Sequence, residues 1–233
     1  MGLNAVSRRS LTALGCACAA LVVSGATAMA AAPVTPTSTT EAGYTVASTG
    51  STFLLKTQFT VPTHACSGQA GIQPGAYTMT ATTSTGGGVL MGCSAETPGY
   101  EAVAMINGVR TVLTKVTVAP GDDINISVAV SASASTVAVI DTTKATRQSE
   151  TGAGSVPTHL FVGDQAVPAS GGGLLAVPNF GKLRFRTTTL NKVDFGSTTP
   201  SAVNMANSAN VVQITTGKLS ATGAAFVTTW VHS

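Results

Sequence analysis

The side chains that could carry out catalysis are few, and they do not form a known catalytic motif. The Gly-x-Ser-x-Gly turn that presents a serine nucleophile is absent from the sequence. Its three histidines, His64, His159 and His232, lack the spacing of metal ligands. Glycine triplets at 86–88 and 171–173 precede strand-like residues rather than a helix, so they predict flexible turns and not a phosphate-binding loop.

Two cysteines and two adjacent acids are the remaining candidates for a metal site. Cys66 and Cys93 are the cysteines that follow the first 30 residues. An isolated pair in an oxidising compartment favours a disulfide, here worth on the order of 3 kcal/mol by chain entropy. Asp122 and Asp123 could bind Ca²⁺, but this ion needs more oxygen ligands, and a solvated turn is favoured. We therefore predict a Cys66–Cys93 disulfide, no metal and no cofactor.

The first 30 residues have the pattern of a secretory signal peptide. Arg8 and Arg9 give a positive start, residues 11–23 are apolar, and the small-x-small triplet at 28–30 predicts cleavage near Ala30. The apolar run is shorter than the ~20 residues of a membrane-spanning helix, which argues against a stable membrane anchor. The sequence therefore predicts a secreted protein, exported by either the general or the twin-arginine route.

The rest of the chain predicts one domain of nearly balanced charge. Without Arg8 and Arg9, ten Lys and Arg remain against nine Asp and Glu. This balance argues against nucleic acid and anionic membranes as partners, because both attract clustered basic residues. Residues 31–50 are rich in Ala, Pro, Thr and Ser and predict a flexible lead-in. Residues 51–233 are long enough for a single domain with a substantial core.

Alternation of apolar and polar residues is the main structural signal. It covers residues 53–61, 124–130, 137–139, 183–185 and 226–231. A period of two predicts strands with one buried face, and no sustained helical period appears after residue 30.

Turn-forming residues separate these segments. Asn107-Gly108 predicts a tight hairpin, and Pro120-Gly121-Asp122 predicts a turn between strands. Many short strands divided in this way predict an all-β sandwich or barrel. Aromatic residues make up only 5% of the chain, which weakens a carbohydrate-binding prediction because such sites use exposed aromatic rings.

Three short segments resemble one known family in content and order. They are Phe-Thr-Val-Pro at 59–62, Val-Ala-Pro-Gly-Asp-Asp-Ile at 118–124 and Val-Pro-Asn-Phe-Gly-Lys-Leu-Arg-Phe at 177–185. The chain resembles the glutamic peptidases (eqolisins, family G1, formerly A4), including secreted bacterial relatives without the active site. The resemblance implies a concanavalin A-like sandwich of two curved antiparallel sheets.

The resemblance also implies where catalytic residues would lie. The family uses a Glu as general base and a Gln that stabilises the oxyanion, both on the concave sheet. Matching the segments puts Met91 at the Gln position and Val162 at the Glu position. Neither side chain can accept a proton or donate to an oxyanion, so these residues predict a homologue without catalytic activity.

One acid could replace the missing glutamate. Asp164 lies two residues beyond Val162, so it points to the same face of a strand. It could act with Gln69, Gln73 or Gln165, although a place beside a turn or at the rim is favoured.

Three functions follow from these residues. The first is a secreted non-catalytic β-sandwich protein with an extracellular ligand, protein or glycan, that the sequence does not identify. The alternative is an acid-acting glutamic-type endopeptidase that uses Asp164. A carbohydrate-binding module is the weaker alternative.

Overall fold

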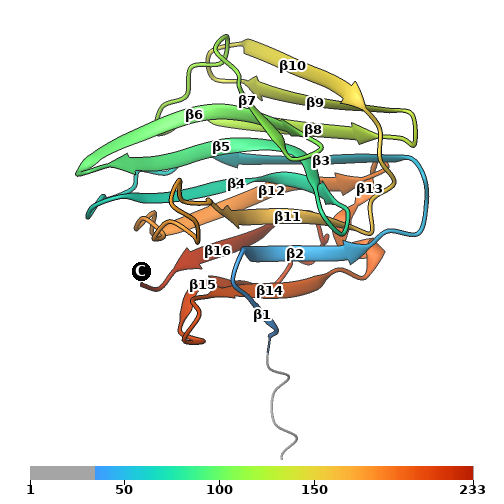
Figure 1. The fold of residues 1–233 in the computed structure, drawn as a ribbon. Helices are drawn as coiled ribbons and strands as arrows, with labels where there is room; N and C mark the ends of the chain where they lie inside the picture. Colours follow the sequence, from blue (N-terminus) through green and yellow to red (C-terminus); the bar gives the residue numbers. More distant parts are fainter. Residues whose placement is uncertain (1–34, 233) are drawn as a thin grey trace, which may run out of the picture. The chain divides into compact units, whose positions relative to one another are not determined.

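The computed structural model describes residues 35–232, which form strands joined by turns and loops (Figure 1). No α-helix occurs in this range, and one short 3₁₀ turn, η1, covers Phe195–Thr198. The strands are β1 (Thr37–Ser38), β2 (Glu41–Ala47), β3 (Phe53–Thr60), β4 (Ala70–Met79), β5 (Ser84–Ser94), β6 (Thr97–Ile106), β7 (Val109–Val112), β8 (Asp123–Val130), β9 (Ala134–Asp141), β10 (Thr146–Ala153), β11 (His159–Ala166), β12 (Lys182–Leu190), β13 (Val193–Asp194), β14 (Ser201–Ala206), β15 (Val212–Thr216) and β16 (Phe226–Trp230).

The strands form the two layers of an antiparallel β-sandwich (Figure 1). One layer has the order β10-β9-β8-β3-β12-β16-β15-β14, and the other has the order β2-β11-β4-β5-β6-β7. Strand β14 also pairs with β2, so hydrogen bonding continues from one layer into the other. Strand β1 adds a short parallel pairing to β14, whereas the pairs along both layers are antiparallel. The all-β concanavalin A-like architecture is therefore confirmed.

The core lies between the layers because each strand alternates its side chains between two faces. In β8 every second residue from Ile124 to Val130 is buried, as the alternation predicts. Aromatic rings fill the centre of this layer, where Phe185 stacks on Phe226 at 4.8 Å and meets Phe59 edge-on at 5.6 Å.

The strand and hairpin predictions are confirmed where alternation was strong. The five alternating segments fall in β3, β8, β9, β12 and β16. Asn107 and Gly108 connect β6 to β7 with φ values of 50° and 82°, the positive pair that a two-residue hairpin turn requires.

Two local predictions differ from the structure. The 86–88 glycine triplet lies within strand β5 and is not a turn. The segment 31–50 was predicted to be a flexible lead-in, but it contains β1 and β2, and Ala42, Tyr44 and Val46 of β2 are core residues. The prediction failed because the segment is rich in threonine and small residues, a composition that is also typical of linkers.

The predicted signal peptide, residues 1–30, lies outside the described residues. Residues 35–232 contain no helix with the length and hydrophobicity that a membrane-spanning helix needs.

Candidate functional site

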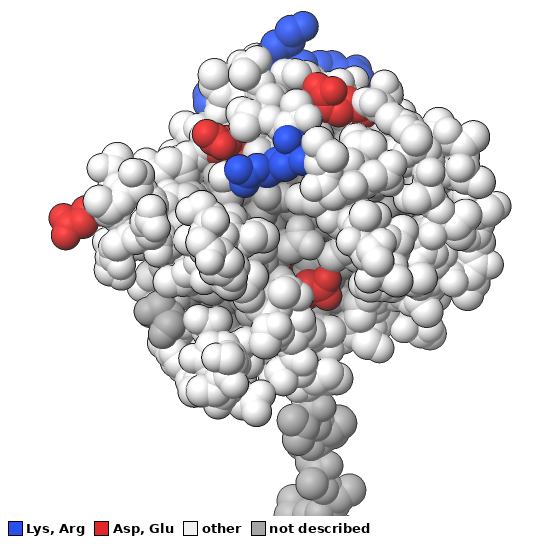
Figure 2. All heavy atoms as spheres, viewed as in Figure 1, with Lys and Arg blue, Asp and Glu red and all other residues white. Residues whose placement is uncertain are grey.

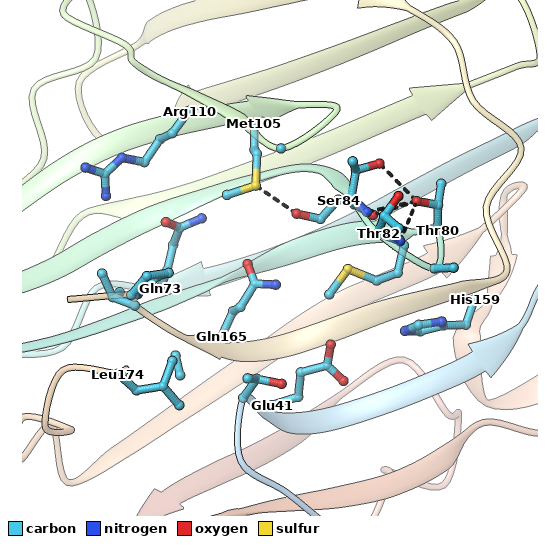
Figure 3. A pocket seen from close by; sticks show the side chains of 18 residues that line it. Glu41, Gln73, Thr80, Thr82, Ser84, Met105, Arg110, His159, Gln165 and Leu174 are labelled. Atoms are coloured by element: carbon cyan, nitrogen blue, oxygen red, sulfur yellow. Dashed lines mark hydrogen bonds between the residues drawn. The ribbon is translucent and has the colours of Figure 1, made fainter. Parts of the chain in front are cut away.

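The β2, β11 and β4 strands present two different faces to their surroundings. Val162 of β11 and Ile72 of β4 belong to the core between the layers. Gln73, one position beyond Ile72, and Gln165, three positions beyond Val162, point to the other face, where they line a hollow of about 740 Å³. We call this hollow the groove (Figure 3). Its wall comprises Thr40, Glu41, Gln73, Met79, Thr80, Ala81, Thr82, Thr83, Ser84, Met105, Gly108, Arg110, His159, Gln165, Ala166, Val167, Pro168 and Leu174.

A carboxylate and two amides lie in one row across the floor of the groove. Strand pairing sets Gln165 opposite Glu41 on β2 and opposite Gln73 on β4. Directly opposed residues have their Cβ atoms about 5 Å apart, so these three side chains are immediate neighbours. Figure 3 shows all three projecting into the same space. We call them the Glu41–Gln165–Gln73 row.

Much of the hydrogen-bonding capacity of this row is unused. Glu41 and Gln165 make no side-chain hydrogen bond or ion pair with any described residue. Gln73 is buried, and its Nε2 donates to the Tyr77 hydroxyl at 2.8 Å, while that hydroxyl donates to the main-chain carbonyl oxygen of Gln73 at 3.1 Å. The pKa of Glu41 is raised because burial penalises its charged form. The row can therefore exchange hydrogen bonds with a bound molecule.

Next to this row, a line of glycines lets two aromatic rings lie flat on the sheet. Strand pairing aligns Gly43 with Gly163, Gly163 with Gly75 and Gly75 with Gly88. A Cβ at Gly75 or Gly88 would come within 2.7 Å of the Tyr77 hydroxyl.

The second ring belongs to Phe161. A Cβ at Gly163 would come within 2.8 Å of it, and Phe161 stacks with Tyr77 at 6.2 Å between ring centroids. Both rings are fully buried. The glycines and the rings that pack on them therefore form a closed part of the groove floor, next to the open polar row. This packing explains why the 86–88 triplet belongs to a strand.

The groove extends toward the far end of β5. A second hollow of about 420 Å³ shares Arg110, Val167 and Pro168 with the first, and adds Leu90 and Leu175. The Arg110 side chain makes no ion pair or hydrogen bond with the described residues. Figure 2 shows that charged side chains are sparse on this side of the molecule. The unpaired Arg110 and the unpaired Glu41, which both line the groove, are therefore unusual features of this surface.

The two positions matched to the catalytic pair do not line the groove. Met91 and Val162 are fully buried members of the core, with their side chains between the two layers. Because faces alternate along a strand, a match displaced by one residue would give Leu90 or Gly92 and Phe161 or Gly163 instead. None of these can transfer a proton.

Asp164 shares the face of Val162, as predicted, but that face is the interior. The favoured position beside a turn or at the rim is wrong, since Asp164 is completely buried within β11. Its carboxylate makes no hydrogen bond within residues 35–232. Burial raises its pKa to about 7, an effect opposed in part by the nearby Thr228 hydroxyl of the other layer. Asp164 and the two amides of the row therefore lie on opposite faces of one sheet.

The other candidate residues have structural roles or lie outside the groove. Gln69 is exposed in the turn before β4 and does not line the groove. The Cys66–Cys93 disulfide is confirmed. Asp122 is buried rather than solvated and pairs with Lys144 at 2.5 Å, while Asp123 pairs with Arg186 at 2.6 Å.

Sequence reasoning missed Glu41 because it fell within the predicted lead-in. A signal was present, since apolar Ala42, Tyr44 and Val46 alternate with Glu41 and Thr45. This short alternation predicts a strand with Glu41 on its outer face.

Comparisons with known proteins identify the fold. No protein-family model matches the sequence, and no curated protein matches it significantly. Scytalido-glutamic peptidase, in complex with a transition state analog inhibitor, superposes with a TM-score of 0.67 at 14% identity, covering 83% of this chain and 98% of the peptidase. SCP-B, an eqolisin in complex with the tripeptide Ala-Ile-His, gives 0.65 at 14% identity with the same coverage.

Aspergilloglutamic peptidase from Aspergillus niger is also similar. Its TM-score is 0.58 at 17% identity, covering 70% of this chain and 99% of the peptidase. The chain therefore has the β-sandwich fold of the glutamic peptidases.

Proposed function

We propose that this protein is a secreted, non-catalytic β-sandwich protein that binds an extended polypeptide segment in the groove. The Glu41–Gln165–Gln73 row carries the proposal, because it places the unpaired side chains of Glu41 and Gln165, next to the Gln73 amide, along a hollow of about 740 Å³. The side chains of Glu41 and Gln165 have no hydrogen-bond partner among the described residues, so a ligand in the groove can supply one.

The chemistry of the groove suits a peptide. The free Gln165 amide offers both a donor and an acceptor, as a peptide backbone does. Met79, Met105 and Leu174 provide apolar surface beside it, which side chains of an extended peptide could contact. SCP-B, which has the same fold, holds a tripeptide.

The absence of catalysis is proposed from the residues on the groove face. A general base must contact the water that it activates. Met91 and Val162 are buried in the core, and their neighbours along the strands, which face the other way, are leucine, phenylalanine and glycine. The burial of Asp164 also argues against this residue as a displaced base, because substrate and water in the groove lie across the sheet from it.

Export is supported by two features. The signal-peptide pattern of residues 1–30 predicts cleavage near Ala30, and disulfides such as Cys66–Cys93 persist in oxidising compartments. N-terminal sequencing of the protein recovered from culture medium tests this. A protein retained in the cell with Met1 intact would contradict it.

A second candidate function is acid peptidase activity by a relocated pair. One observation favours it: the Glu41 carboxylate lies in the same hollow as the Gln165 amide, one strand away. A carboxylate with a raised pKa can serve as a general base or acid at low pH, and an amide N–H can stabilise an oxyanion.

One pair of assays separates these functions. Fluorescein-labelled, denatured casein is incubated with the mature protein across about pH 2–7, with cleavage followed by mass spectrometry and binding by fluorescence polarisation. We expect intact casein, bound about tenfold more weakly by Gln165→Ala, because a hydrogen bond to a ligand contributes about 1.4 kcal/mol. Glu150→Gln on β10, outside the groove, is the matched control for Glu41→Gln and should bind like the parent.

Each other outcome supports a different function. Cleavage that disappears in Glu41→Gln but persists in Glu150→Gln would contradict the non-catalytic function and support peptidase activity by Glu41 and Gln165. Cleavage that disappears in Asp164→Asn alone would support the buried acid instead. Casein that is neither bound nor cleaved, together with binding on a glycan array, would support the carbohydrate-binding alternative.

A further inference from the structure

One histidine, His64, lies next to the Cys66–Cys93 disulfide, in a corner of the sandwich at the end of β5 where Cys93 lines the second hollow. A ring nitrogen of His64 and the sulfur atoms of Cys66 and Cys93 lie within 4.8 Å of one another. Imidazole nitrogen and cysteine sulfur are the preferred ligands of Zn²⁺ in proteins. The fold thus brings together three residues that can bind Zn²⁺, although their spacing in the sequence did not predict a metal site.

The hydrogen bond made by His64 determines which of its nitrogens can bind a metal. Its Nε2 lies 3.0 Å from the Gly92 carbonyl oxygen, which can only accept, so Nε2 carries the proton and donates. In the neutral ring Nδ1 then bears the free lone pair. This atom is buried and has no hydrogen-bond partner within the described part of the chain. Metal-binding histidines commonly donate their second nitrogen to a carbonyl in this way.

The backbone around the three ligands is held on both sides. The Ala65 N–H donates to the Asn179 carbonyl at 2.8 Å, which fixes the segment that carries His64 and Cys66. Cys93 lies in β5, paired with β4 and β6. His64 itself is 6% exposed and packs edge-on against Tyr100 at 4.8 Å. These contacts hold the backbone on both sides of the disulfide independently of the S–S bond.

Solvent can reach this corner. A hollow of about 360 Å³ adjoins His64, and another of about 240 Å³ adjoins Cys66. Cys66 is partly exposed, so a small reductant has access to the disulfide. A water molecule from either hollow could complete a tetrahedral site.

We propose that reduction of the Cys66–Cys93 disulfide converts this corner into a Cys₂His site for Zn²⁺. Two electrons and two protons convert the disulfide to two thiols. With a phosphine as reductant, the phosphine takes the oxygen atom of one water and becomes the phosphine oxide. Zn²⁺ then displaces the two thiol protons and takes the Nδ1 lone pair as its third ligand, which leaves the fourth position to water.

Cobalt titration of the mature protein tests the proposal. The protein is reduced with a phosphine, desalted without oxygen and titrated with Co²⁺, whose visible absorption reports tetrahedral sulfur ligation. We expect one equivalent to bind, Zn²⁺ to displace it, and the same protein with its disulfide intact to show no such absorption. His64→Ala should weaken cobalt binding at least about tenfold, whereas His159→Ala, which alters the wall of the groove and not the His64–Cys66–Cys93 cluster, should leave cobalt binding unchanged.

Several results would overturn the proposal. One is a reduced protein without the cobalt absorption, and another is equal affinity in the parent and His64→Ala. Circular dichroism is recorded in parallel, because the site requires a folded corner. Loss of the β-sheet spectrum on reduction that Zn²⁺ does not restore would also contradict the proposal. The peptide-binding assays use the oxidised protein with its disulfide intact, so results on the reduced protein and peptide binding are distinguishable.

Discussion

Two carboxylates on neighbouring strands have opposite environments in this protein. Asp164 of β11 and Glu41 of β2 differ by one position in the register of the two strands, since Asp164 pairs with Ala42 and Gln165 pairs with Glu41. That single step puts Asp164 in the core between the layers and Glu41 in the groove. Burial raises the pKa of both, but only Glu41 can meet a ligand.

The difference shows that the strand face, more than residue type, decides what an acid can do. An acid sealed between two sheets acts through stability, because its ionisation opposes folding. An acid that faces a hollow beside free amides acts through binding, and its effect on stability is small. The predictions that follow test this division, from the largest expected effect to the smallest.

Asp164→Asn should remove most of the loss of stability that the ionisation of Asp164 causes as the pH rises. The folded pKa of Asp164, about 7, exceeds the ordinary value of 3.8, so its contribution to stability is present below about pH 4 and is lost as the pH rises through 7. Relative to the parent, the variant should gain about 4 kcal/mol of unfolding free energy between about pH 3.5 and pH 8. Urea unfolding at both values measures it. A parent and variant with parallel pH profiles would place Asp164 in contact with water.

Gly163→Ala should destabilise the floor of the groove by roughly 2 kcal/mol or more. Gly163 has a φ of 154°, and an added Cβ would lie 2.1 Å from the Ala42 carbonyl oxygen. Gly171→Ala is the matched control, because nothing lies within 4 Å of its added Cβ, and it should change stability by less than about 0.5 kcal/mol. Equal thermal-unfolding midpoints for the two variants would contradict the closed glycine floor.

Glu41→Gln should have the smallest effect on stability, within about 0.5 kcal/mol, because the side chain has no partner to lose. The variant should nevertheless bind casein more weakly than the parent. Denaturant unfolding and fluorescence polarisation on one preparation provide both values. A large loss of stability would mean that Glu41 has a structural role and would remove it from the binding site.

Most of the fold could be predicted from the sequence, because it is encoded in alternation and turn chemistry. The segments around Phe59, Ile126 and Phe185 formed strands as predicted, and so did the hairpin at Asn107-Gly108. The prediction of a turn at the 86–88 triplet was wrong because these glycines are required by a tertiary contact. The Tyr77 ring packs on Gly86 and Gly88, and side chains there would collide with it.

The candidate site was harder to predict than the fold. The face of a strand changes with every residue, so a match uncertain by one residue cannot decide whether Met91 faces the core or the groove. Glu41, Gln73 and Gln165 lie far apart in the chain, and only strand pairing brings them together. The closeness of His64 to the disulfide likewise depends on the folded corner.

Nuclear magnetic resonance of the side-chain amides tests the central claim most directly. The ¹⁵N-labelled mature protein is titrated with casein peptides while the NH₂ signals of Gln73, Gln165 and Gln213 are followed. We predict that Gln73 and Gln165 shift in a saturable manner, that Gln213 on β15 does not, and that the peptides are recovered with unchanged mass. Peptides that leave the Gln165 signal unmoved, or that are recovered as fragments, would contradict binding without cleavage in the groove.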